Sequence, residues 1–160
     1  MDFEFIVKKL IFALLKKGFT MATAEQCTCG LIGAAVSSQE YPQRWYKGTV
    51  TAYSQDSINK LLAVPLYVIE KNGVVSSQVA QQMALDVIYK YCVNIATSVV
   101  GNIDGYGKEV QICVAKMDKQ QVSFSYKKVL VGGCDKGKKM ETIINEALLL
   151  TIEHIEGKTE

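Results

Sequence analysis

The chain has 160 residues, of which 49% are apolar and 21% are charged, so it is long enough for one domain with a sizeable core and too short for two. Its formal net charge of +2 provides no general basic field of the kind that attracts nucleic acid, and we expect no nucleic-acid partner. Arg44 is the one arginine among the 18 basic residues, although arginine is the side chain best shaped to bind a phosphate through two parallel hydrogen bonds. These numbers predict a single globular domain over residues 1–160.

The cysteines and the N-terminal segment indicate a reduced, cytoplasmic protein. An odd number of cysteines, five, does not suggest a disulfide framework in a chain of this size. The apolar segment from Phe3 to Leu15 contains lysines and is shorter than the roughly 20 residues of a membrane span, so we expect neither a signal peptide nor a membrane partner. Cys27 and Cys29 have no second Cys/His pair at zinc-ligand spacing, and we therefore expect no metal and no cofactor.

The first elements alternate between helix and strand. Apolar residues at helical spacing from Phe3 to Leu14 predict a helix that ends at Gly18, because glycine tolerates the positive φ of a helix C-terminus. A short strand over residues 19–24 and a helix over residues 28–37 follow, joined by a tight turn.

The rest of the chain continues the alternation and ends in a hairpin and a long helix. In chain order we expect a strand over residues 50–53, a helix over 54–62, a helix over 65–73, a helix over 76–91, strands over 95–100, 110–117 and 122–131, and a helix over 140–155. This order predicts an α/β protein with three α/β/α layers and a mixed, mostly parallel sheet of about five strands.

The turn at residues 24–30 is the first candidate site. It reads Ala-Glu-Gln-Cys-Thr-Cys-Gly and joins the first predicted strand to the second predicted helix. In an open α/β sheet, ligands bind at the carboxyl ends of the strands, where backbone N–H groups at a helix start can hold an anion. We therefore expect a ligand to bind at this turn.

From this turn onward the sequence resembles the CinA C-terminal domain family, in which the turn commonly reads A-E-S-C-T-G-G. The likeness continues in the same order and spacing: residues 50–54 match V-x-A-Y-S, residues 61–64 match L-L-G-V, and residues 72–84 match H-G-A-V-S-x-x-V-A-x-x-M-A. The resemblance implies the fold of a nicotinamide mononucleotide deamidase. In active members a serine hydroxyl attacks the carboxamide while a lysine and a tyrosine help to move protons.

Two residues depart from the catalytic pattern that the resemblance implies. The family's serine falls on Gln26, whose amide cannot attack a carbonyl, and its lysine falls on Ile58, which carries no proton. Tyr53 retains the tyrosine. We therefore expect a catalytically degenerate relative with at most a weak pocket for a pyridine nucleotide. The positions expected to contact a ligand are Glu25, Thr28, Gly30, Tyr53, Ser54 and Gly101.

Three more departures concern the handling of phosphate. Where the family commonly has T-G-I-A-G-P followed by glycines, Asp104 would place a negative charge close to a nucleotide's phosphate. Lys136 corresponds to an arginine of the family's G-D-R segment, so a fork of two donors becomes a point charge. Cys29 takes a glycine position, where its side chain either narrows the pocket or is simply tolerated by the turn. Together these departures predict weak or absent binding of a phosphorylated substrate.

An active amidohydrolase of altered specificity is the first alternative. In it Cys27 attacks, with Tyr53 and either Thr28 or Glu25 assisting, because a thiolate at a helix start can be reactive. Cys27 is also the residue that the family carries beside its serine, and the competing interpretation is a small buried packing residue.

A non-enzymatic, oligomeric partner protein is the second alternative. Phe5 and Phe12 fall on the lysine-bearing face of the first helix, so we expect self-association through that face. The lysines between Lys116 and Lys139 are expected on the outer faces of edge strands. His154, the one histidine, is expected to be exposed to solvent and to lack a catalytic partner.

Overall fold

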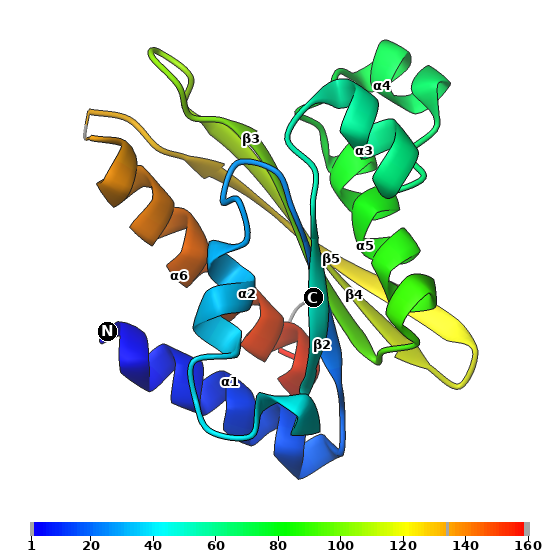
Figure 1. Cartoon of the computed structure of the whole chain (residues 1–160), viewed down its shortest axis with the longest axis vertical. Helices are drawn as coiled ribbons and strands as arrows, with labels where there is room; N and C mark the ends of the chain where they lie inside the picture. The colour runs from blue at the N-terminus through cyan, green and yellow to red at the C-terminus, as the bar shows by residue number, and fades with distance from the viewer. Residues whose placement is uncertain (1, 134, 159–160) are drawn as a thin grey trace.

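The computed structural model describes residues 2–133 and 135–158, and it shows one sheet with helices on both faces (Figure 1). Cys134, at the start of the segment that aligns with G-D-R, lies outside the described residues. The strands are β1 (Met21–Glu25), β2 (Tyr46–Thr51), β3 (Ile95–Asn102), β4 (Glu109–Asp118) and β5 (Gln121–Leu130). The helices are α1 (Phe3–Lys17), α2 (Leu31–Val36), α3 (Gln55–Leu61), α4 (Leu66–Asn72), α5 (Ser77–Tyr91) and α6 (Lys136–Glu156), with a 3₁₀ turn η1 (Pro42–Arg44) before β2.

The sheet has the strand order β2-β1-β3-β4-β5, which confirms the mixed sheet of five strands. β1 pairs in parallel with both β2 and β3, whereas β3 with β4 and β4 with β5 are antiparallel. Two of the four pairings are therefore parallel and two antiparallel, and β1, β2, β3 and β5 run in the same direction, as expected for a mixed, mostly parallel sheet. The late hairpin turns at Lys119 and Gln120, both of which adopt positive φ, as a tight two-residue β-turn requires.

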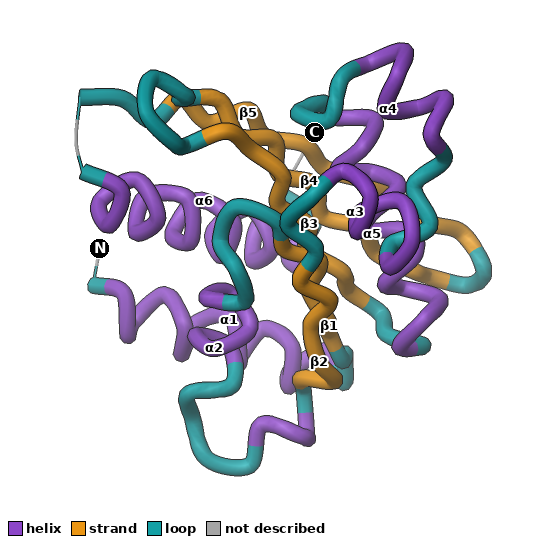
Figure 2. Tube along the Cα trace, turned by 45° about the horizontal axis from the view of Figure 1, so that its top comes forward, coloured by secondary structure: helices purple, strands orange, loops and turns teal. Residues whose placement is uncertain are grey.

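Two layers of helices cover the sheet: α1, α2 and α6 lie on one face, and α3, α4 and α5 on the other (Figures 1 and 2). Alternation along the strands divides the core between the faces. Met21, Ile95 and Val99 pack under the first layer, while Ala22 and Ala96 pack under the second. This arrangement is the predicted three-layer α/β/α architecture.

The starts of β2, α2 and α6 differ most from the sequence prediction, and α6 begins four residues before the predicted helix. β2 begins at Tyr46, four residues before the predicted strand, because this edge strand is only partly buried and lacks a strong apolar alternation. α2 begins at Leu31 rather than at residue 28, because Cys29 and Gly30 both adopt positive φ and interrupt the helical path. The turn before α2 is therefore longer than predicted.

Two charged or titratable side chains of α6 lie inside the protein, contrary to expectation. His154 is 5% exposed, and its Nδ1 and Nε2 lie 2.6 Å and 3.2 Å from the hydroxyl oxygens of Ser125 and Ser123 on β5. Lys139 is also buried, not on an outer strand face. The reason is tertiary: α6 crosses β4 and β5, so its inner face is turned toward the sheet. Within the described ranges, no helix is long and apolar enough to cross a membrane.

Candidate functional site

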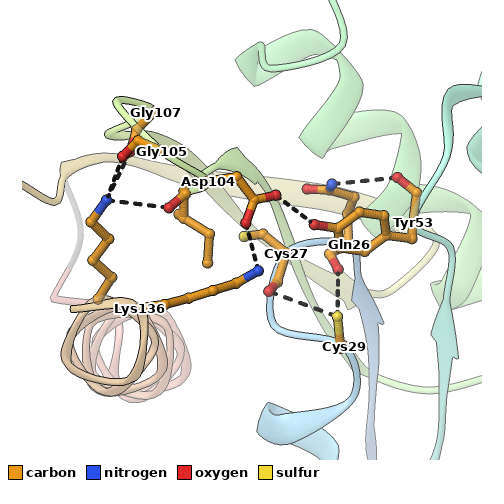
Figure 3. A network of polar contacts seen from close by, with 10 residues as sticks. Gln26, Cys27, Cys29, Tyr53, Asp104, Gly105, Gly107 and Lys136 are labelled. Atoms are coloured by element: carbon orange, nitrogen blue, oxygen red, sulfur yellow. Dashed lines mark hydrogen bonds and ion pairs between the residues drawn. The ribbon is translucent and has the colours of Figure 1, made fainter.

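The carboxyl ends of β1, β2 and β3 meet at one edge of the sheet because these strands are parallel. The structure there brings together Gln26 after β1, Tyr53 after β2 and Gly101 near the end of β3. Lys136 joins them from the start of α6 through a contact with Asp104 in the β3–β4 loop (Figure 3). The sequence prediction of a site at this edge therefore agrees with where the strands end.

Glu25 serves the turn itself. Its buried carboxylate accepts hydrogen bonds from the hydroxyls of Thr23 (3.0 Å) and Thr28 (2.6 Å). It also accepts backbone N–H bonds at the start of α2, from Gly30 (2.9 Å), from residue 32 (3.1 Å) and from residue 33 (2.8 Å). The N–H groups that were expected to hold a ligand anion are thus occupied by a carboxylate of the chain itself.

Gln26 joins the ends of the three parallel strands. Its Nε2 donates to the backbone carbonyl of Tyr53 at 3.4 Å (Figure 3). Its Oε1 accepts the backbone N–H of Gly101 at 3.0 Å. The side chain is therefore held at both polar atoms in the position where the resemblance places a serine. Ile58 lies on the inner side of α3, is 0% exposed and packs in the core, and its side chain has no polar atom to offer the site.

The two cysteines of the turn have opposite surroundings. Cys27 is 1% exposed and packs in the core, and burial raises the pKa of its thiol to about 12. Such a thiol remains protonated near neutral pH and is poorly suited to attack a carbonyl. Cys29 is exposed and adopts φ 52°, and its Sγ lies 3.5 Å from the backbone carbonyl oxygen of Gln26 (Figure 3). The side chain is thus tolerated at the glycine position, in a backbone conformation that favours glycine.

Three polar side chains from distant parts of the chain form a rim cluster, which we define as Tyr53, Asp104 and Lys136. The Tyr53 hydroxyl donates to Oδ2 of Asp104 at 3.0 Å, and the Lys136 ammonium contacts Oδ1 at 2.5 Å (Figure 3). Hydrogen bonds from Lys136 and Tyr53 hold the pKa of Asp104 below its usual range. The hydrogen bond to Asp104 raises the pKa values of both Tyr53 and Lys136. Asp104 is therefore a paired anion, which the sequence did not indicate.

Lys139 on α6 holds the loop that carries Asp104. The buried ammonium of Lys139 donates to the backbone carbonyls of Ile103 (3.2 Å), Gly105 (3.4 Å) and Gly107 (3.2 Å). All three of its protons can thus be satisfied without a carboxylate. Sequence reasoning missed this role, because nothing in the lysine-rich segment distinguishes Lys139 from its exposed neighbours.

The other predicted ligand positions are mostly used by the fold. Thr28 is buried against Glu25, and Ser54 caps α3 by accepting the backbone N–H of residue 57 at 3.1 Å. A Cβ on Gly101 would lie 2.6 Å from a side-chain carbon of Val110, so glycine is required there by close packing. Gly30 adopts φ 90° at the start of α2. Of the predicted ligand positions, Tyr53 is the one that belongs to the rim cluster, and its side chain is exposed.

The described residues contain no metal-binding cluster, and an apolar groove lies to one side of the candidate site. Over residues 2–133 and 135–158, no three His, Cys, Asp or Glu side chains gather in a way that could hold a metal ion. An apolar groove of about 400 Å³ lies nearby, between the starts of α1, α2 and α6. Its lining residues are Phe3, Leu31, Gly137, Met140, Glu141 and Ile144.

Sequence comparison identifies relatives over part of the chain. A CinA-like protein of Desulfotalea psychrophila is 39% identical over 89 residues, which are 56% of this chain and 22% of that protein. A CinA-like protein of Flavobacterium psychrophilum is 34% identical over 99 residues, which are 62% of this chain and 23% of that protein. The matched region thus spans less than a quarter of the length of these curated relatives.

Solved structures with the same fold cover nearly the whole chain. A Competence-Damaged Protein (CinA) superfamily protein of Klebsiella pneumoniae superimposes with a TM-score of 0.88 at 20% identity, over 98% of this chain and 99% of that one. The competence/damage inducible protein CihA of Agrobacterium tumefaciens gives a TM-score of 0.88 at 23% identity, over 98% and 96% of the two chains. The family model of the CinA C-terminal domain matches residues 4–155. Since that match covers nearly all of the sheet and both helical layers, the chain belongs to the CinA C-terminal domain family.

Proposed function

We propose that this protein is a catalytically degenerate member of the family, which keeps the fold of a nicotinamide mononucleotide deamidase and at most a weak pocket for a pyridine nucleotide. The observation that carries the proposal is the position of Gln26, whose amide is hydrogen-bonded on both sides between Tyr53 and Gly101. An amide held in this way supplies no nucleophile where the resemblance places the serine. Ile58, buried in the core, supplies no base.

The turn offers no ready replacement for the missing groups. Cys27 is buried with a raised pKa, and the carboxylate of Glu25 is fully engaged at the start of α2. Tyr53 retains an exposed hydroxyl, but its hydrogen bond to Asp104 raises its pKa, so the phenol stays protonated near neutral pH and no phenolate is available as a base. These contacts support the degenerate enzyme over an amidohydrolase that uses Cys27.

Ammonia release from nicotinamide mononucleotide tests the proposal. We expect no release above the rate without protein, for the wild type and for Cys27→Ala alike, while an active family member assayed in parallel shows turnover. Release by the wild type at the rate of an ordinary amidohydrolase, abolished in Cys27→Ala, would show that the site is active and that the proposal is wrong.

A role as an oligomeric partner protein is compatible with this proposal and has its own support. Phe5 and Phe12 are 55% and 68% exposed on the outer face of α1, beside the exposed side chain of Lys8. Exposed aromatic side chains on one helix face are typical of contact surfaces. We propose self-association through this face, in a reducing compartment such as the cytoplasm, which the four free cysteines among the described residues also support.

Light scattering tests the self-association. The double variant Phe5→Ser/Phe12→Ser is expected to have a lower molar mass than the wild type. The matched control is Tyr89→Ser on α5, which removes an equally exposed aromatic residue and is expected to keep the wild-type mass. An unchanged mass in the double variant would remove the support for this surface.

A further inference from the structure

We propose that Asp104 sets the charge selectivity of the site: the rim cluster rejects a phosphate or carboxylate and accepts a ligand that is uncharged or cationic at that end. The preferred class would then be a pyridine nucleoside rather than its phosphorylated form. This inference rests on the proposed function, because it takes the residual pyridine pocket as its starting point.

Asp104 already accepts hydrogen bonds from two donors that an anionic ligand at the rim would use. The Tyr53 hydroxyl and the Lys136 ammonium each contact a different carboxylate oxygen, at 3.0 Å and 2.5 Å. A phosphate could take the Tyr53 proton only by displacing the carboxylate, and at the remaining N–H groups of Lys136 it would lie against Asp104 as a like charge.

The backbone of Asp104 is anchored, so the loop that carries it is not free to withdraw from the rim. Lys139 binds the carbonyls on both sides of it, and the N–H of Gly107 donates to the Asp104 carbonyl at 2.8 Å. Ile103, the preceding residue, is 3% exposed and packs in the core. The loop thus keeps the backbone of Asp104 at the rim, and the contacts to Tyr53 and Lys136 orient its carboxylate.

The rim cluster leaves no excess positive charge for a ligand. Asp104 neutralises Lys136, and the three donors of Lys139 are directed at backbone carbonyls rather than at the rim. Because its pKa is lowered by Lys136 and Tyr53, Asp104 remains ionised through neutral pH. A phosphate at the rim therefore meets the like charge of Asp104, whereas the uncharged 5′-hydroxyl of a nucleoside meets no such opposition.

The test compares two probes that differ by one phosphate, nicotinamide riboside and nicotinamide mononucleotide, by isothermal titration calorimetry at low salt. The wild type is expected to bind the riboside more tightly. Asp104→Asn keeps the shape of the side chain and removes its charge, and it should tighten the mononucleotide by about fivefold while changing the riboside by less than twofold. The matched control is Asp86→Asn, which makes the same change at an Asp–Lys pair on α5 and is expected to alter neither affinity.

Each outcome bears on the inference. In Asp104→Asn/Lys136→Gln the gain for the mononucleotide should disappear, because the released cation is removed. Tighter binding of the mononucleotide than the riboside by the wild type, an unchanged ratio in Asp104→Asn, or no binding of either probe would overturn the inference. The proposed loss of catalysis fails separately, by ammonia release, so the two failures are distinguishable.

Discussion

Replacing Glu25 with alanine should destabilise the protein severely, because this carboxylate organises the turn at the candidate site. Both of its oxygens accept hydrogen bonds, from two threonine hydroxyls and from three backbone N–H groups at the start of α2. Of these donors, the Thr23 hydroxyl also lies 3.3 Å from the Tyr46 hydroxyl. Removing the carboxylate leaves these donors facing a cavity at a position that is 0% exposed.

The expected loss follows from the number and burial of those donors. A buried donor left without an acceptor costs about 1–3 kcal/mol. The N–H groups of Ile32 and Gly33 are buried, while that of Gly30 is only partly buried and can be hydrated. With the hydroxyls free to rotate toward other acceptors, we expect a loss of about 4 kcal/mol in the free energy of unfolding, a large part of the about 5–15 kcal/mol typical of a domain.

Urea unfolding followed by tryptophan fluorescence measures this loss. Trp45 is the one tryptophan of the chain, is 3% exposed and donates to the carbonyl of Val36 at the end of α2, so it reports on the same region. Glu25→Gln, which replaces one acceptor oxygen with a donor, should lose about half as much, and Glu40→Ala at an exposed position should stay within about 0.5 kcal/mol of the wild type. A loss below about 1 kcal/mol in Glu25→Ala would refute the structural role and favour a ligand-binding one.

Two further predictions concern thiols and pH. An alkylating reagent at pH 8 should label Cys29 rapidly and Cys27 only upon unfolding, as peptide mass spectrometry can measure; equal native rates would contradict the burial of Cys27. Burial, with the nearby charge of Lys116, lowers the pKa of His154 below its ordinary 6.5. The unfolded chain therefore binds the proton first, and the free energy of unfolding should fall as pH drops below about 6.5. His154→Asn should flatten that dependence, and a variant with the wild-type slope would contradict it.

Much of the fold could be predicted because its signals are local. The apolar stripe of α5 and the Ser76 side chain, which accepts the N–H of Val79 at 3.2 Å, define a helix almost as predicted. The edge strand β2 was predicted too short, because a half-exposed edge carries little apolar alternation. The connection between β3 and β4 is a loop with no crossover helix, and the antiparallel pairing of these strands gives the sheet its mixed character.

The sequence placed the candidate site at the strand ends, which stays a prediction, and it did not indicate the contacts made there. The resemblance directed attention to Gln26 and Ile58, and the structure gives each a definite environment, one hydrogen-bonded across strand ends and the other in the core. The pairing of Asp104 with Tyr53 and Lys136 could not be predicted, because these residues are 51 and 32 positions apart from it in the chain. Such a pairing depends on how the segment after β2, the β3–β4 loop and the start of α6 are placed relative to one another in the fold.

The sequence by itself determined the near-neutral charge and the scarcity of arginine, which follow from counting. It also determined that Gln26 and Ile58 stand where the resemblance places a serine and a lysine, whereas a single domain stays a prediction. Only the tertiary structure decided what the remaining polar groups do. It buries Lys139 and His154, turns Glu25 inward to hold α2, and neutralises Asp104 with Lys136 at the rim. The physical reason is that burial and charge pairing depend on which faces meet when α6 packs across the sheet, and no local pattern in the chain records that choice.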